Sequence, residues 1–318
     1  MLDIADAPSS CRSCAFMVRC FGQPDEGPLL RPPIVRDLWV TEPIVANGIA
    51  SRMITAGRSG PVVLLVHGEG GSADRWAFNL NAIARAGFRA VAVDLPGHGF
   101  ADKTGPQSIP AYADFLAAVM DRFDGPLALV GASISAQVVA RVAAARPADV
   151  CALILTAGTS LAVGPESIAK LQRQLVYRTR EGALERFRRA FWDARIADAS
   201  LVEQEFRMNT SPGAAEAQRG LAQYLADHLD AEADLAALRR VAAATPTLIL
   251  WGADDHLTPV AHARDAVVGL EGRARLVEMA KTGHIPNFER PGEFNSHLID
   301  FLRPPATATV PVQLELAR

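Results

Sequence analysis

Continuous apolar runs alternate with amphipathic stretches along most of this chain. The runs "PVVLLVHG", "FRAVAVDLPGHG", "PLALVGAS" and "DVCALILTAG" have the unbroken hydrophobicity of strands buried on both faces of a parallel sheet. The stretches between them, 74–87, 109–125 and 135–147, have apolar residues at helical spacing. This strand–helix alternation predicts an α/β fold with a doubly wound, mainly parallel sheet.

The strand–helix alternation is preceded by a predicted hairpin and interrupted by a long helical stretch, and these two features divide the chain into segments. Residues 42–57 alternate around Asn47-Gly48, which predicts a hairpin. From about residue 160 to residue 240, helical patterns follow one another without a strand, and we expect these helices to form a cap over a site. Within this range, an Arg/Glu-rich helix face around 180–190 is expected at the surface. The predicted organisation is an N-terminal extension (1–38), a first core part (39–159), a helical cap (160–240), a second core part (241–304) and a C-terminal tail (305–318).

Composition narrows the class of protein. The 318 residues are 49% hydrophobic and 21% charged, with a formal net charge of −3, as in ordinary soluble globular proteins. This charge gives no basic field for nucleic acid. No apolar run reaches the roughly 18 residues that a membrane span needs, and the first residues lack a signal-peptide pattern. We therefore expect a cytoplasmic protein that acts on a small molecule, with no nucleic-acid or membrane partner; a homo-oligomer is left open.

The cysteines do not complete a metal site. Cys11, Cys14 and Cys20 cluster near the N-terminus and contain one C-x-x-C pair, while Cys151 lies in an apolar run. A zinc site needs about four ligands, and no second pair or nearby histidine supplies the rest. We expect reduced thiols, no metal and no cofactor.

The small-residue turn 131–135, which follows the apolar run "LALV", contains the candidate nucleophile. A serine hydroxyl needs exposure on a sharp strand-to-helix turn, and such a turn requires small residues two before and two after it. Centred on Ser133, these flanks are Gly131 and Ser135; centred on Ser135, they include the bulky Gln137. Ser133 is therefore the predicted nucleophile, with Ser135 in a packing position, although a serine-rich helix N-cap is the alternative.

A glycine-rich loop, "HGEGG", is suited to hold a developing oxyanion with backbone N–H groups. We expect the N–H groups of Glu69 and Ile134 to be the donors. The Glu69 carboxylate would oppose an oxyanion, so its side chain should point away or pair with a cation. His67 is expected to be structural.

The acid and the base follow later strands. Two aspartates follow the apolar stretch "LILWG", where an acid that orients a histidine should lie. Asp255 is preferred to Asp254 because it fits the spacing Gly252-x-x-Asp255-x-x-x-Pro259 of this kind of turn, although a helix N-cap is the alternative role for either. His284 lies in a loop after the last predicted strand, from which a base can reach a serine at the sheet edge. The other histidines are expected to be structural or helical.

In this order, "HGEGG", "DLPGHG", "GASIS", "WGADDHLTP" and "GHIPNFERPGEFN" resemble the α/β-hydrolase superfamily over roughly residues 40–303. The resemblance implies a Ser133 nucleophile, an Asp255 acid, a His284 base and a lid made by the inserted helices. Ser135 replaces the glycine of the commonest pattern. A serine nucleophile is unlike the aspartate of haloalkane dehalogenases and epoxide hydrolases.

The cap resembles that of meta-cleavage-product hydrolases, which cleave carbon–carbon bonds. Those enzymes usually have tryptophan after the catalytic histidine and an arginine in the cap, where this chain has Ile285 and Glu205, with Arg207 two residues on. We therefore expect a carboxylic ester hydrolase, with C–C hydrolysis or non-hydrolytic binding as alternatives. The candidate pocket residues are Phe191, Trp192, Phe206, Arg207 and Ile285, although aromatic side chains at helical spacing also suit a plain core.

Overall fold

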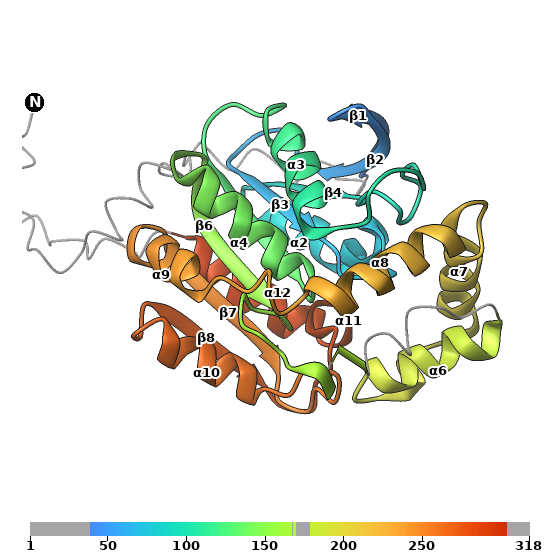
Figure 1. Cartoon of the computed structure of the whole chain (residues 1–318). Helices are drawn as coiled ribbons and strands as arrows, with labels where there is room; N and C mark the ends of the chain where they lie inside the picture. Colours follow the sequence, from blue (N-terminus) through green and yellow to red (C-terminus); the bar gives the residue numbers. More distant parts are fainter. Residues whose placement is uncertain (1–38, 167, 170–178, 304–318) are drawn as a thin grey trace, which may run out of the picture.

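A single twisted sheet forms the centre of the molecule in the computed structural model, which describes residues 39–166, 168–169 and 179–303 (Figure 1). The strand order is β1-β2-β4-β3-β5-β6-β7-β8. The pairs β1–β2 and β2–β4 are antiparallel and all the others are parallel. The strands are β1 (Val40–Ala46), β2 (Ile49–Ala56), β3 (Val62–Val66), β4 (Arg89–Val93), β5 (Leu127–Ala132), β6 (Val150–Thr156), β7 (Thr247–Gly252) and β8 (Ala274–Met279). This confirms the predicted doubly wound, mainly parallel sheet.

Helices cover both faces of the sheet. One face packs against α3, α4, α9 and α10, and the other against α2 and α12. The central strands β3 and β6 are completely buried, which explains their unbroken apolar runs. The helices of the described residues are η1 (Ala73–Trp76), α2 (Ala77–Arg85), α3 (Ile109–Met120), α4 (Ser135–Ala145), η2 (Pro147–Asp149), α6 (Arg180–Ala190), η3 (Ala194–Ile196), α7 (Ala199–Asn209), α8 (Ala214–His228), α9 (Leu235–Ala244), α10 (Ala261–Gly269), α11 (Pro286–Glu289) and α12 (Pro291–Leu302).

The predicted hairpin is present between β1 and β2. Asn47 and Gly48 occupy its turn with φ angles of 48° and 73°, the left-handed conformations that a two-residue hairpin turn of the primed type requires. The hairpin extends the sheet by two antiparallel strands at the edge opposite β8. Arg52 of β2 pairs with Asp94, which directly follows the carboxyl end of β4.

The inserted helices divide into two groups. Helices α6 and α7 share their own apolar cluster, which includes Ala183, Phe187 and Val202. Helix α9, which begins inside the expected cap range, instead packs against α4 through Leu238 and Val241. Figure 1 shows α6 and α7 beyond the carboxyl ends of the strands, with α8 leading back to the core. The cap in contact with the strand ends is therefore smaller than the range 160–240.

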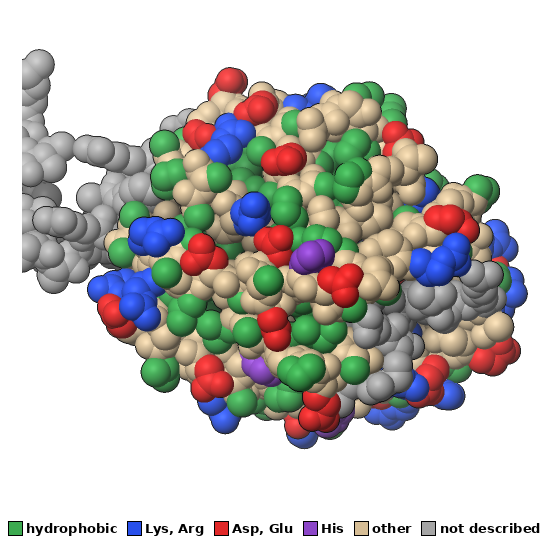
Figure 2. Space-filling view, in the orientation of Figure 1, with side chains coloured by type: hydrophobic (Ala, Val, Ile, Leu, Met, Phe, Trp, Pro, Cys, Tyr) green, Lys and Arg blue, Asp and Glu red, His purple; other side chains and the backbone are tan. Residues whose placement is uncertain are grey.

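The predictions about chain ends, metal sites and membrane spans can be compared with the described residues only. The extension 1–38, with Cys11, Cys14 and Cys20, and the whole tail 305–318 lie outside the described residues; Cys151 is buried in β6. Across the described ranges, no cluster of three or more His, Cys, Asp or Glu side chains could hold a metal ion. In the same ranges, no helix combines the length and apolarity that a membrane crossing requires. Figure 2 shows acidic and basic side chains interspersed on the visible face.

Candidate active site

Ser133 lies on a sharp turn between β5 and α4. Its φ of 53° is in the left-handed region, which costs a residue with a Cβ atom of the order of 1–3 kcal/mol. Neighbouring positions leave no room for side chains: a Cβ atom on Gly131 would lie 2.4 Å from the Ser135 carbonyl oxygen, and one on Gly158 would lie 2.1 Å from that of Ser133. Close backbone packing thus holds Ser133 at the strand end.

Ser135 has a different environment from Ser133. It is completely buried, and its hydroxyl donates a hydrogen bond to the backbone oxygen of His67. This bond ties the start of α4 to the end of β3. The structure therefore places Ser135 in the packing position that the sequence predicts for it, while Ser133 lines a cavity.

The structure brings Ser133, His284 and Asp255 together in a hydrogen-bonded series. The Nε2 atom of His284 lies 3.1 Å from Ser133 Oγ, and its Nδ1 lies 2.8 Å from Asp255 Oδ2. His284 comes from the loop between β8 and α11, and Asp255 from the turn after β7. This is the geometry of a nucleophile, a base and an acid that orients the base.

Asp255 is fixed by several donors. Its Oδ1 accepts backbone N–H bonds from Leu257 (2.8 Å) and Thr258 (2.9 Å), and its Oδ2 accepts the Thr258 hydroxyl at 2.9 Å. Asp254, by contrast, is only half-buried, and its backbone N–H donates to Thr282. The structure thus directs Asp255, and not its neighbour, toward the histidine.

The charge of Asp255 controls the protonation of His284. Burial alone would lower the pKa of the imidazole, but the negative charge of Asp255 and its hydrogen bond act in the opposite direction. The net result is that the pKa of His284 lies above its ordinary value. Asp255 therefore stabilises the imidazolium that forms when His284 takes a proton.

Glu289 holds the loop that contains His284. Its carboxylate accepts backbone N–H groups on both sides of the histidine, from Gly283 (3.0 Å) and Ile285 (3.2 Å), and a third from Trp192 at 2.7 Å. Burial raises the pKa of the Glu289 carboxyl, and these N–H bonds act against the rise. The His284 N–H itself donates to the Ala190 oxygen at the end of α6, at 2.6 Å. The loop is thus attached to the cap.

The N–H groups of Glu69 and Ile134 are the predicted oxyanion donors. Both flank Ser133: Ile134 follows it, and a Cβ atom on Gly68 would lie 2.9 Å from Ser133 Cβ. Within the described residues neither N–H donates a hydrogen bond to another protein group. Both are therefore free to bind a developing negative charge.

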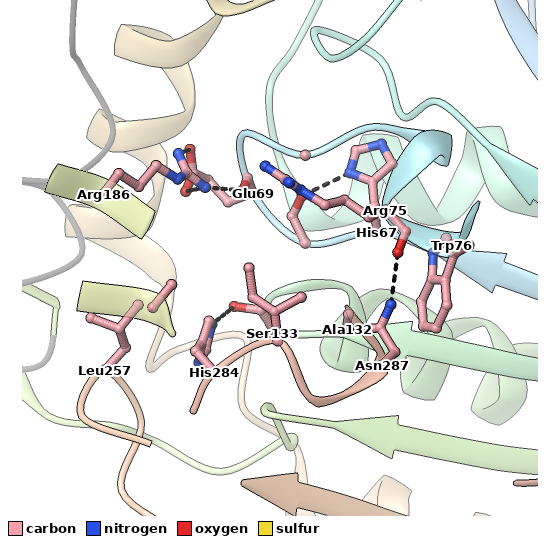
Figure 3. A pocket seen from close by; sticks show the side chains of 14 residues that line it. His67, Glu69, Arg75, Trp76, Ala132, Ser133, Arg186, Leu257, His284 and Asn287 are labelled. Atoms are coloured by element: carbon pink, nitrogen blue, oxygen red, sulfur yellow. Dashed lines mark hydrogen bonds and ion pairs between the residues drawn. The ribbon is translucent and has the colours of Figure 1, made fainter. Parts of the chain in front are cut away.

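The Glu69 carboxylate is paired with a cation, which is one of the two arrangements that we expect for it. Arg186 of α6 lies 3.0 Å from Glu69 Oε2, and Figure 3 shows the two side chains directed at one another above Ser133. Burial raises the pKa of the Glu69 carboxyl, and the positive charge of Arg186 opposes this rise. Arg186 comes from the helix face expected at the surface, yet it is largely buried, because it neutralises Glu69.

A second ion pair adjoins the first. Arg75 of η1 pairs with Glu205 of α7, and Arg186 lies 3.6 Å from the same Glu205 carboxylate. We call Glu69, Arg75, Arg186 and Glu205 the four-charge cluster. Its members alternate in sign and come from both core and cap. The cluster was not predicted, because its side chains meet only through the tertiary fold.

A cavity of about 60 Å³ lies between these groups. Of the five predicted pocket residues, Ile285 lines it and the other four do not. Phe191 stacks on Phe187 and Phe288 instead, and Phe206 lies under Arg180. Trp192 is exposed, and Arg207 is an exposed partner of Glu203. The lining residues that sequence reasoning missed include Arg75, Trp76, Ala190, Leu257 and Asn287.

His67, which lines the cavity, and His98 each have a hydrogen-bond partner outside the catalytic series. His67 is buried, and its Nε2 accepts the Leu95 N–H while its Nδ1 lies 2.7 Å from the Gly68 oxygen. Burial lowers the pKa of His67, and burial likewise lowers that of His98 to about 3. Both histidines are therefore neutral and structural, as the sequence predicts for them.

The sequence and the fold both have counterparts among known proteins. Residues 61–291 match the family model described as the alpha/beta hydrolase fold. The dihydrolipoyllysine-residue acetyltransferase component of the acetoin cleaving system of Pseudomonas putida is 30% identical over 249 residues, which are 78% of this chain and 65% of that protein. The chain therefore spans just under two thirds of that relative's length.

Two further similarities cover most of both chains. The 2-hydroxy-6-oxononadienedioate/2-hydroxy-6-oxononatrienedioate hydrolase of Burkholderia vietnamiensis is 28% identical and matches 78% of this chain and 88% of its own. The crystal structure of a serine hydrolase involved in carbazole degradation superposes with a TM-score of 0.74 at 22% identity, covering 83% of this chain and 99% of that one. The last similarity concerns the fold alone.

Proposed function

The chain belongs to the alpha/beta hydrolase fold family, and we propose that it is a serine hydrolase that cleaves carboxylic esters of small apolar or aromatic substrates. The observation that carries this proposal is the series Ser133 Oγ–His284 Nε2 at 3.1 Å and His284 Nδ1–Asp255 Oδ2 at 2.8 Å. Neutral charge balance around the cavity also suits an uncharged ester, because each arginine of the four-charge cluster is paired with a glutamate.

The first half of the reaction forms an acyl-enzyme. His284 Nε2 takes the Ser133 hydroxyl proton as the oxygen attacks the ester carbonyl carbon. The carbonyl oxygen becomes an oxyanion, which accepts hydrogen bonds from the N–H groups of Glu69 and Ile134. When the carbon–oxygen bond breaks, the imidazolium returns the proton to the leaving alkoxide, and the alcohol departs.

The second half releases the acid. A water molecule gives a proton to His284 and attacks the acyl carbonyl, and collapse of the second oxyanion breaks the bond to Ser133. The serine oxygen takes the proton back, so ester and water have become acid and alcohol. Asp255 keeps its charge throughout and stabilises the imidazolium in both halves.

Labelling with a fluorophosphonate, followed by peptide mapping, tests the nucleophile. We expect the label on Ser133 in the wild type and in Ser135→Ala, and none in Ser133→Ala. The untreated wild type should also hydrolyse p-nitrophenyl esters, and it should lose that activity once the fluorophosphonate has reacted. A label on Ser135, or no label on folded protein, would refute the assignment; saturable ligand binding without turnover would then favour a binding protein.

Carbon–carbon bond hydrolysis is the second candidate. It is favoured by the Burkholderia vietnamiensis relative, named as an oxo-dienedioate hydrolase, and by two arginines, Arg75 and Arg186, that line the cavity. Each of these cations already has a carboxylate partner, which disfavours a charged substrate. Decay of the visible absorbance of a 2-hydroxy-6-oxo-dienoate, compared with p-nitrophenyl ester turnover by the same preparation, separates the two activities.

A further inference from the structure

A second cavity lies next to the catalytic one. Its volume is about 310 Å³, compared with about 60 Å³ for the cavity at Ser133, and of the described residues only Arg75 lines both. The outer cavity lies between η1 and α2 of the core and α7 of the cap. Its lining is mixed. One part is apolar and consists of Ala77, Phe78, Leu201, Met208 and Phe288, and the other part is polar or charged and consists of Ser72, Asp74, Arg75, Asp198, Ser200, Gln204 and Glu205.

The inner cavity is too small for the proposed substrates. An engineered apolar cavity of about 150 Å³ binds one benzene molecule, and the inner cavity, at about 60 Å³, is much smaller and accommodates only a short group. The outer cavity, at about 310 Å³, is larger than that example. It also leaves Phe78, a large apolar side chain, 54% exposed. A ligand there would cover apolar surface that is otherwise in contact with water.

The orientation of the site indicates which part of the substrate points there. His284 must protonate the leaving alkoxide, so the alcohol departs on the His284 side of Ser133. Figure 3 shows His284 and Leu257 on one side of Ser133, and Trp76 and Asn287 on the other. Trp76 is the last residue of η1, and this segment borders the outer cavity through Asp74 and Arg75. The acyl group therefore extends toward the outer cavity.

We infer that the outer cavity is the binding site for the distal part of a medium-length apolar acyl chain, with Arg75 as the divider between it and the catalytic cavity. The Arg75 guanidinium pairs with Glu205 and lies 4.7 Å from the Phe187 ring centroid, so it is held in place from the cap side. Acyl groups longer than the inner cavity extend past Arg75 and contact Phe78 and Met208. This inference rests on the proposed ester hydrolysis.

Filling the outer cavity tests this inference. Ser200 of α7 lines it and is exposed, so Ser200→Trp would occupy its space; Gln204→Trp, one turn further along, is a second variant with the same purpose. Ala199→Trp is the matched control, because Ala199 is exposed on the same helix outside the lining. The measurement is kcat/KM for p-nitrophenyl acetate and p-nitrophenyl octanoate, expressed as the octanoate-to-acetate ratio.

We expect the ratio to fall by roughly ten-fold or more in Ser200→Trp and Gln204→Trp, since one displaced methylene alone changes kcat/KM by about ten-fold or more. Ala199→Trp should keep the wild-type ratio. An unchanged ratio in both cavity variants, with ester turnover intact, would overturn the outer site and leave the proposed function standing. A wild-type protein that hydrolyses neither ester would overturn the function, and the acyl site with it.

Discussion

The Ser133 turn and the four-charge cluster lie on two sides of the same cavity, yet they are built in opposite ways. The turn is made from consecutive residues with small side chains, and its geometry depends on backbone packing and a φ of 53°. The cluster joins residues as far apart as Glu69 and Glu205, and its geometry depends on long charged side chains. The chemistry is thus local in the chain, while the surroundings of the substrate are assembled between core and cap.

The two regions also differ in the source of their unfavourable free energy, which is backbone strain in the turn and burial of charge in the cluster. Backbone strain of the order of 1–3 kcal/mol at Ser133 is retained wherever the turn folds. The cluster instead removes two glutamates from water, and each requires its arginine, because an uncompensated buried charge costs several kcal/mol. Substitutions in the turn should therefore affect the reaction, and substitutions in the cluster should affect the attachment of the cap.

Ser133→Ala tests the turn and should have the largest effect. Without the nucleophile, kcat should fall by roughly four to six orders of magnitude, as removal of a triad serine does elsewhere. Ester turnover, measured beside Ser135→Ala, checks this. Ser135→Ala should lose far less, because that hydroxyl bonds the His67 oxygen and does not reach the substrate. Residual activity of Ser133→Ala above about a hundredth of wild type would contradict the assignment.

Glu289→Ala tests the support of the base. Loss of the carboxylate frees the N–H groups of Gly283 and Ile285, so we expect His284 to shift and kcat to fall by about a hundred-fold, the cost of a misplacement near 1 Å. Glu289→Gln keeps one acceptor oxygen and should recover part of the loss. If kcat stays at the wild-type level in Glu289→Ala, the carboxylate does not position the loop.

Arg186→Met tests the cluster through stability. Removal of this cation leaves Glu69 buried with its charge uncompensated, which should lower the free energy of unfolding at pH 7 by roughly 3 kcal/mol. The pKa of Glu69 is already raised by burial, so the variant's deficit should shrink as the pH falls and the carboxyl takes up a proton. Urea unfolding at several pH values measures this.

The matched control for this experiment is Arg180→Met. Arg180 belongs to the same helix, but its pair with Glu203 is exposed to water. Exposed pairs contribute little to stability, so the unfolding curve should stay near that of the wild type. Equal destabilisation by both substitutions would mean that general loss of charge on α6, and not the buried pair, is responsible.

The pH profile should show the smallest effect. His284 must be neutral to act as a base, so kcat/KM should rise with pH as the imidazole loses its proton. Because Asp255 holds the pKa of His284 above its ordinary value of 6.5, the midpoint of the rise should lie above pH 6.5. A midpoint below 6.5 would show that burial outweighs the Asp255 charge.

The sequence predicts the sheet, its hairpin and the meeting of Ser133, Asp255 and His284, because each depends on short-range patterns at strand ends. It does not predict the cavity lining. Phe191 and Phe206 have helical spacing, but spacing does not tell which neighbour a face meets, and these rings pack on Phe288 and under Arg180. Arg186 had no local signal, since its partner Glu69 is far away in the chain.

The hydrogen bond from the His284 N–H to the Ala190 oxygen has a consequence for protein engineering. Exchange of caps between enzymes of one fold is an obvious route to new substrates, since the inserted helices leave and re-enter the core at adjacent points. In this molecule the junction at Ala190 also supports the base. A grafted cap would have to place a carbonyl oxygen at the same point, so the choice of donor is limited by backbone geometry before any side chain is considered.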